Sequence, residues 1–164
     1  MAEGLHGSRD ASQSQRRRGL VLTQCRMNTG YSLRLAAELK NLAVIRSFVQ
    51  ESAAVLDVAP AIISDLLLAV DEAVTNVITH GYRGQQGTIE IEVKREAVDV
   101  VVHMRDNAPP FDPTNVPSPD LTRPLEERPP GGLGIYLIRQ YMDEVIYRLM
   151  PEGGNELILK KRIR

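Results

Sequence analysis

One stretch, residues 65–82, constrains the fold of this chain more than any other. Its apolar residues recur at intervals of three and four, which is the period of an α-helix. Pro60 lies just before the stretch and suits a first helical turn, whereas Gly81 suits the left-handed residue that ends a helix. Because nearly the whole surface of this helix is apolar, we expect most of it to be buried.

Two polar side chains interrupt this apolar helix. Glu72 and Asn76 are four residues apart and therefore share one face. A carboxylate in a buried helix is costly unless it has a partner. One interpretation is a solvated strip, with Asn76 bonding back to its own helix. The other is a polar cavity, in which Glu72 is an acid–base group and Asn76 is an oxygen ligand for a hard cation such as Mg²⁺.

Composition excludes several classes of protein. The net charge of −1 and an aromatic content of 4% without Trp do not indicate nucleic-acid binding. The longest apolar run is too short for a membrane span, and the chain does not open with a signal peptide. Cys25 is the only cysteine, so an intrachain disulfide is excluded, and we interpret Cys25 as an incidental thiol. These features favour a cytoplasmic protein without a membrane or nucleic-acid partner.

The order of the remaining elements predicts an α+β fold. Residues 1–29 have the composition of a disordered tail, and residues 30–164 are expected to form one domain. Within that domain, periodicity predicts a strand at 31–35, a helix at 36–56 and, after the central helix, a hairpin of 88–95 with 98–105. A short helix at 135–142 and a hairpin of 144–150 with 156–162 complete the chain. A two-layer sandwich results, with one sheet face covered by helices and the other exposed or used for dimerisation.

Two loops of the predicted domain carry further signals. Asp106 leaves a strand and enters a proline-rich loop, and residues 114–130 then read as a long, lid-like loop. A glycine turn directly before a helix is a site for phosphate, although this signal is weak on its own. That turn consists of Gly131, Gly132, Leu133 and Gly134. Walker A and G-x-G-x-x-G motifs are absent. His103, on the polar side of its strand, is predicted to be an ordinary surface histidine.

Taken in order, the Glu72–Asn76 pair, Asp106 and the glycine turn resemble the ATP-binding fold of the GHKL superfamily. Residues 71–82 and 131–145 are similar to those of the bacterial anti-sigma factor serine/threonine protein kinases, and the resemblance extends from about residue 31 to the end. It implies a two-layer α/β sandwich of the GHKL (Bergerat) type, with a mixed, mostly antiparallel sheet and helices on one face. It also implies a homodimer that uses ATP and Mg²⁺.

The resemblance also implies roles for single residues. Glu72 would be the general base, Asn76 would coordinate Mg²⁺, and Asp106 would accept a hydrogen bond from the adenine amino group. The further residues implied at the nucleotide are Ala108, Gly131, Gly132, Leu133, Gly134 and Asn155. Asn155 stands where the family usually has Thr. Ala108 stands where it usually has Gly, and this methyl group could narrow the approach of the backbone to adenine.

Two functions are compatible with these residues. In the first, the chain phosphorylates a serine or threonine of an anti-anti-sigma (STAS-domain) partner and sequesters a sigma factor by partner switching. In the second, it is a nucleotide-dependent binding module without kinase activity. An ATPase or histidine-kinase catalytic domain is a third interpretation, which the lack of a preceding helix with a phosphoacceptor His disfavours. Glu72 favours the first function, because binding alone does not need a base at that position.

Overall fold

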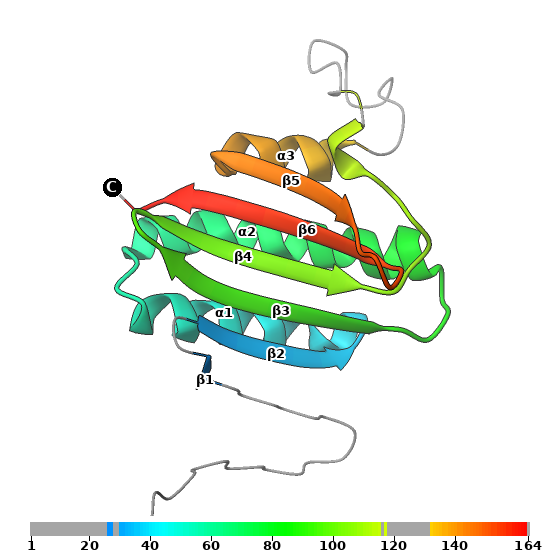
Figure 1. The fold of residues 1–164 in the computed structure, drawn as a ribbon, viewed down its shortest axis with the longest axis horizontal. Helices are drawn as coiled ribbons and strands as arrows, with labels where there is room; N and C mark the ends of the chain where they lie inside the picture. Colours follow the sequence, from blue (N-terminus) through cyan, green and yellow to red (C-terminus); the bar gives the residue numbers. More distant parts are fainter. Residues whose placement is uncertain (1–25, 28–29, 116, 118–131, 164) are drawn as a thin grey trace, which may run out of the picture.

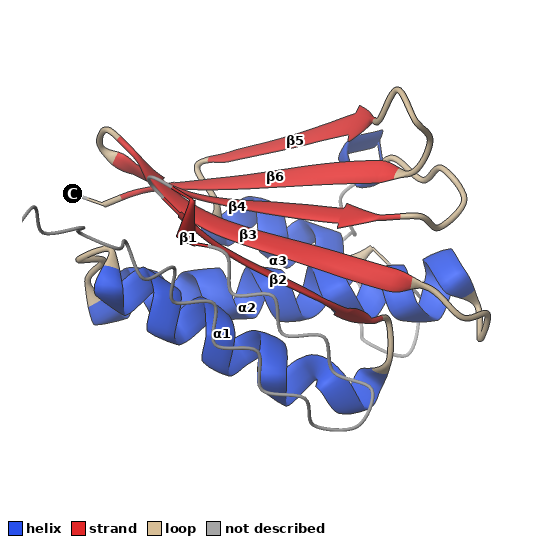
Figure 2. Cartoon of the chain, turned by 60° about the horizontal axis from the view of Figure 1, so that its bottom comes forward, coloured by secondary structure: helices blue, strands red, loops and turns tan. Residues whose placement is uncertain are grey.

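A single antiparallel sheet with helices on one face organises the chain. The computed structural model describes residues 26–27, 30–115, 117 and 132–163. The strand order is β1-β2-β3-β4-β6-β5, and each neighbouring pair of described strands is antiparallel. Three α-helices lie against one face of this sheet (Figures 1 and 2). The predicted two-layer α+β sandwich is therefore confirmed.

The elements follow the predicted order along the chain. The strands are β1 (Arg26–Met27), β2 (Gly30–Ala36), β3 (Thr88–Glu96), β4 (Asp99–Asp106), β5 (Glu144–Leu149) and β6 (Asn155–Arg162). The helices are α1 (Leu42–Val55), α2 (Pro60–Asn76) and α3 (Leu133–Tyr141). Three shorter turns are η1 (Leu39–Asn41), η2 (Val77–Tyr82) and η3 (Pro113–Asn115).

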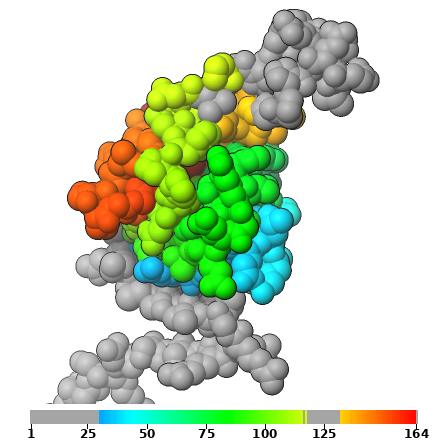
Figure 3. All heavy atoms as spheres, turned by 90° about the vertical axis from the view of Figure 1, so that its right-hand side faces the viewer, coloured from blue at the N-terminus to red at the C-terminus, as the bar shows by residue number. Residues whose placement is uncertain are grey.

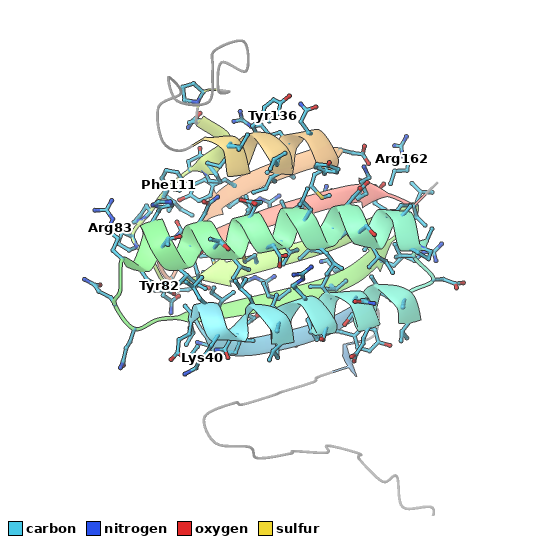
Figure 4. The ribbon with its side chains drawn as sticks, turned by 180° about the vertical axis from the view of Figure 1, so that it is seen from behind. Lys40, Tyr82, Arg83, Phe111, Tyr136 and Arg162 are labelled. Carbon is cyan, nitrogen blue, oxygen red and sulfur yellow. The ribbon has the colours of Figure 1, made fainter. Side chains whose placement is uncertain are left out.

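The core lies between the helices and the alternating apolar residues of the strands. In β3, Ile89, Ile91 and Val93 are completely buried, whereas the residues between them keep part of their surface exposed. They share one apolar cluster with α2, whose Leu66 and Val74 are also completely buried. Full burial of a side chain of this size contributes about 1.5–3 kcal/mol. These contacts fix α2 in the middle of the helical layer, between α1 and α3 (Figure 4).

The end of α2 differs from the sequence-based prediction. Gly81 does not take the left-handed conformation; η2 extends the helix as a π-helical turn, and Arg83 takes that conformation with φ of 50°. The prediction for Gly81 was therefore wrong. Because Gly81 has no side chain, Ala108 can pack close to its backbone: a Cβ at Gly81 would lie 3.0 Å from the Cβ of Ala108. Single π-helical turns occur frequently at functional sites.

On the sheet face without helices, Glu90, Glu92, His103, Arg105 and Glu156 form one connected group, which we call the open-face cluster. The Arg105 guanidinium contacts Glu156 at 2.9 Å and both Glu90 and Glu92 at 3.0 Å. His103 Nδ1 lies 3.0 Å from the same Glu156 oxygen. Burial alone would raise the pKa of Glu156, but the hydrogen bonds from His103 and Arg105 outweigh burial and lower the pKa.

His103 is therefore not an ordinary surface histidine, and that prediction was wrong. Its side chain is 12% exposed, and its Nε2 atom is buried without a hydrogen-bond partner in the described part of the chain. The strand register places His103 directly opposite Glu92 on one side and Ile158 on the other, so neighbouring side chains cover the ring.

The segment predicted to be a tail is described only in part. Arg26–Met27 pair with β2, so these two residues extend the sheet. Residues 1–25 and 28–29, Cys25 included, lie outside the described residues. Most of the predicted lid, 116 and 118–130, also lies outside them. None of the described helices combines the length and the apolar character that crossing a membrane requires.

Candidate functional site

A cavity lies where α2, the loop after β4, and strands β5 and β6 meet. Its lining is mostly apolar, and its polar side chains are Asn76, Asp106, Tyr147 and Asn155. Figure 3 shows this end of the molecule, with the yellow-green segment after β4 between the green end of α2 and the orange turn between β5 and β6. A mostly apolar cavity with a few convergent polar groups is the usual form of a small-molecule site.

Asp106 is the charged group of this cavity. It ends β4 with only 4% of its surface exposed, and its Oδ1 atom accepts hydrogen bonds from the Ala108 N–H at 2.9 Å and from Asn155 Nδ2 at 2.8 Å. Burial raises the pKa of Asp106, although the hydrogen bonds from Asn155 and Ala108 act in the opposite direction. Its Oδ2 atom has no hydrogen-bond partner within the described ranges and can accept one from a ligand.

Asn155 joins three parts of the site. It is the first residue of β6 and lies opposite Asp106 in the strand register. Besides Asp106, its amide nitrogen donates to the Ala108 carbonyl at 3.0 Å, and its amide oxygen accepts a hydrogen bond from the Tyr147 hydroxyl at 2.7 Å. The contact between Asn155 and Asp106 was not predicted from the sequence, and the role of Asn155 toward a nucleotide stays a prediction.

The loop after Asp106 is anchored by Tyr82. The Tyr82 hydroxyl accepts hydrogen bonds from the N–H groups of Asn107 at 2.9 Å and of Thr88 at 3.2 Å. It also donates to the Thr88 carbonyl at 2.7 Å. The ring fits because Gly87 has no side chain, since a Cβ there would lie 2.0 Å from the ring. The π-helical turn therefore fixes the start of the loop that lines the cavity.

Glu72 and Asn76 approach the glycine turn from α2. A Cβ at Gly134 would lie 2.5 Å from Glu72 Oε2 and 3.5 Å from Asn76 Nδ2, so the missing side chain lets α3 pack against both residues. Both are half-buried, and within the described part of the chain neither side chain has a hydrogen-bond or ion-pair partner. Asn76 lines the cavity, and Glu72 lies one helical turn away from it. Only Asn76 of the two lines the cavity, and the roles of both residues stay predictions.

The neighbouring carboxylate points elsewhere. Asp71 lies 3.3 Å from Arg46 of α1. Burial raises the pKa of Asp71 and the charge of Arg46 lowers it, with burial the larger effect. The two consecutive acidic residues 71 and 72 therefore occupy different environments, and only Glu72 faces the glycine turn.

The glycine turn leads into α3, which begins two residues earlier than predicted, so that Leu133 and Gly134 belong to the helix. Gly132 has a left-handed φ of 83°, and its carbonyl accepts the first helical hydrogen bond, from the Tyr136 N–H at 3.0 Å. The N–H groups at the start of a helix have no partner within it and favour an anion. Leu133 is 47% exposed, so its side chain is not part of the cavity lining. Gly131 lies outside the described residues.

The sequence of this chain matches one family model over most of its length. Residues 35–161 match the model described as the histidine kinase-like ATPase domain. This chain belongs to that family. The matched range contains every described residue of the site, from Glu72 to Asn155.

Similar proteins include two curated kinases and one solved structure. The chain is 35% identical over 95 residues to "Serine/threonine-protein kinase BtrW" of Bordetella bronchiseptica, covering 57% of this chain and 66% of that protein. It is 29% identical over 136 residues to "Serine-protein kinase RsbW" of Bacillus cereus, covering 80% of this chain and 84% of that protein. The crystal structure of the RsbU and RsbW domains of Rv1364c from Mycobacterium tuberculosis has a similar fold, with a TM-score of 0.58 and 18% identity. It aligns with 82% of this chain and with 32% of that longer chain.

Three members of the site in this histidine kinase-like ATPase domain were not predicted from sequence. Tyr82 and Tyr147 contribute hydroxyl groups from η2 and β5. Gly81 has no side chain, which leaves room for Ala108. Tyr147 lies in the middle of a predicted strand, where a tyrosine carries no local signal of this kind. Gly81 stands at the end of the apolar helical pattern, and this position pointed to helix termination instead.

Proposed function

We propose that this chain is an ATP-dependent serine/threonine protein kinase that regulates transcription by partner switching. Its substrate would be an anti-anti-sigma (STAS-domain) protein, and its second partner a sigma factor. The observation that carries the proposal is the position of Glu72, half-buried and unpaired against Gly134, one turn from Asn76 at the cavity. The family match and the two similar kinases support it.

The donor set fits a nucleotide with Mg²⁺. Mg²⁺ usually takes one or two protein oxygens and completes its shell with phosphates and water. Asn76 offers such an oxygen, and the described residues contain no group of three or more His, Cys, Asp or Glu side chains that would bind a metal without a nucleotide. The cation would neutralise charge on the phosphates. Asp106 would bind the adenine base of the nucleotide, and the first N–H groups of α3 would bind phosphate oxygens.

In the proposed reaction, Glu72 acts as the general base. Its carboxylate takes the proton from the serine or threonine hydroxyl, and the hydroxyl oxygen then forms a bond to the γ-phosphorus of ATP. The bond between that phosphorus and the oxygen bridging the β- and γ-phosphates breaks, and ADP leaves with the electron pair. The role is available to Glu72 because no cation of the described chain is paired with it.

The test replaces the base and keeps its shape. Glu72→Gln should bind ATP about as well as the wild type, but its rate of phosphate transfer to the partner should fall by roughly a hundred-fold or more, as loss of a general base implies. The matched control is Glu51→Gln on the exposed side of α1, which should leave both quantities unchanged. Asn76→Ala should lose Mg²⁺-dependent nucleotide binding together with activity. Phosphotransfer by Glu72→Gln at the wild-type rate would show that the base is misassigned.

A binding module without kinase activity is the alternative function. It shares the cavity and the glycine turn but does not need a carboxylate at residue 72. Wild-type protein that binds an anti-anti-sigma protein only with ATP, and transfers no phosphate to it, would establish this alternative in place of the kinase.

We also propose that the chain forms a homodimer in the cytoplasm. No helix of the described chain covers the sheet face that carries the open-face cluster (Figure 2). An uncovered sheet face is a common site of subunit association. Sedimentation that finds only monomers at micromolar protein concentration would contradict this proposal.

A further inference from the structure

The hydrogen bonds around Asp106 continue beyond its direct neighbours to β5. Tyr147 donates to Asn155 at 2.7 Å, and Asn155 donates to Asp106 at 2.8 Å. The three side chains come from the strands β5, β6 and β4, which are neighbours in the sheet. All three line the cavity. The arrangement is therefore one continuous relay from a tyrosine hydroxyl to the carboxylate of the site.

The direction of every bond in this relay is determined. An amide has donors only at nitrogen and acceptors only at oxygen. The nitrogen of Asn155 faces two acceptors, Asp106 Oδ1 and the Ala108 carbonyl, and could not be exchanged with the oxygen without repulsion. The oxygen therefore faces Tyr147, whose hydroxyl supplies the donor that a buried carbonyl oxygen needs.

The relay determines which oxygen of Asp106 remains for a ligand. Its Oδ1 already receives two donors, from Ala108 and Asn155. Its Oδ2 is the oxygen that remains for a ligand in the cavity that Asp106 lines, and an ionised carboxylate can only accept. A base that presents an amino group there gains a hydrogen bond. A base that presents a carbonyl oxygen to Oδ2 brings two acceptors into contact. A site built to accept a hydrogen bond from its ligand discriminates strongly against such a base.

We propose that Tyr147 is a positioning residue that sets the selectivity of this cavity for a purine carrying an exocyclic amino group. It acts through Asn155, which holds the Asp106 carboxylate at a fixed angle. This inference rests on the proposed nucleotide-binding function and assigns a role to a residue whose hydroxyl bonds to Asn155.

Loss of the Tyr147 hydroxyl has a defined consequence. The oxygen of Asn155 is buried, and its only remaining donor in the described chain is the Phe111 N–H at 3.4 Å, a long contact. The amide therefore turns toward water or the cavity, and Asp106 loses one of the two donors that fix its angle. The net free energy of one hydrogen bond corresponds to roughly a tenfold change in binding affinity. The phenylalanine ring still fills the space of the tyrosine ring.

The experiment measures binding of three diphosphates with Mg²⁺ to wild type and to Tyr147→Phe. ADP carries the amino group, inosine diphosphate carries an oxygen in its place, and purine riboside diphosphate carries neither. Tyr147→Phe should bind ADP roughly tenfold more weakly while its affinity for purine riboside diphosphate stays unchanged. The preference for ADP over inosine diphosphate should fall by at least the same factor. Tyr141→Phe, which removes an exposed hydroxyl from the end of α3, is the matched control and should change none of these values.

A second variant tests whether Tyr147 acts through the amide. Asn155→Ala should lose the same selectivity, and the double variant with Tyr147→Phe should lose no more than Asn155→Ala alone. Equal weakening of all three ligands by Tyr147→Phe, or additive losses in the double variant, would overturn the inference and leave the proposed function standing. If the wild type binds none of the three diphosphates, the proposed function fails, and this inference fails with it.

Discussion

The contact between Gly81 and Ala108 allows a quantitative test of how the cavity is built. In Gly81→Ala, the new methyl carbon would lie 3.0 Å from that of Ala108, whereas carbon atoms in contact prefer about 3.5–4.0 Å. Overpacking of this kind costs about 1–3 kcal/mol. Gly81 does not have a positive φ, so alanine fits the backbone and regains about 0.4–1 kcal/mol through the unfolded state. We expect a net loss of about 1 kcal/mol.

The reciprocal change should rescue the first. Ala108→Gly alone loses a buried methyl group, about 0.8 kcal/mol, and adds backbone freedom to the unfolded chain. In the double variant, one methyl group again occupies the space between η2 and the loop after β4. The two changes should therefore be coupled by about 1–3 kcal/mol in the free energy of unfolding. Because both residues line the cavity, nucleotide affinity should fall in Gly81→Ala and recover in the double variant.

Urea unfolding of the four proteins measures this coupling. The matched control pairs Gly81→Ala with Ala53→Gly, a buried alanine near the end of α1, where the two effects should simply add. Additivity of Gly81→Ala and Ala108→Gly within about 0.5 kcal/mol would refute the reasoning, because it would mean that the two residues do not share one space.

Three further predictions concern the same site. Because burial raises the pKa of Asp106, ADP affinity should begin to fall at a higher pH than the ordinary aspartate pKa of 3.8 would give as the pH is lowered. Calorimetry in which the affinity follows a group with the ordinary value of 3.8 would contradict this. In Gly134→Ala the new Cβ would displace the Glu72 carboxylate, so the initial rate of phosphotransfer should fall at least tenfold, and an unchanged rate would argue against a base at this position. Tyr82→Phe removes the acceptor of two backbone N–H groups and should cost about 1–3 kcal/mol in urea unfolding; an equally stable variant would mean that water replaces the hydroxyl.

Much of the architecture could be predicted from the sequence because periodicity is a local property. The alternation in residues 88–95 fixes which side chains of β3 face the helices, and the three-and-four spacing in residues 65–78 does the same for α2. The strand register also follows from short connections, since a tight turn leaves few alternatives. The positions of Glu72, Asn76 and Asp106 around one site were accessible through their resemblance to a family rather than through periodicity.

The remaining features depend on contacts between residues far apart in the chain. His103 and Glu156 are separated by 53 positions, and Tyr82 and Asn107 by 25. Nothing in the neighbourhood of His103 reveals that an arginine-centred group of carboxylates will surround it. Gly81 was misjudged for the same reason: the local pattern of a glycine after a helix is common, while the methyl group that it accommodates belongs to Ala108 in the loop after β4.

The pairing of β4 with β6 gives the proposed recognition of a nucleotide base an additional consequence. Asp106 and Asn155 are direct register partners, so a slip of one residue between these strands would turn Asn155 to the opposite face of the sheet. A chain with shifted strands could not retain the nucleotide, and only the correctly paired sheet is stabilised by it, by about 2.7 kcal/mol when the ligand is present at a hundred times its dissociation constant. In the cell, a bound nucleotide would thus favour the correctly paired sheet over shifted pairings, in addition to serving as a substrate.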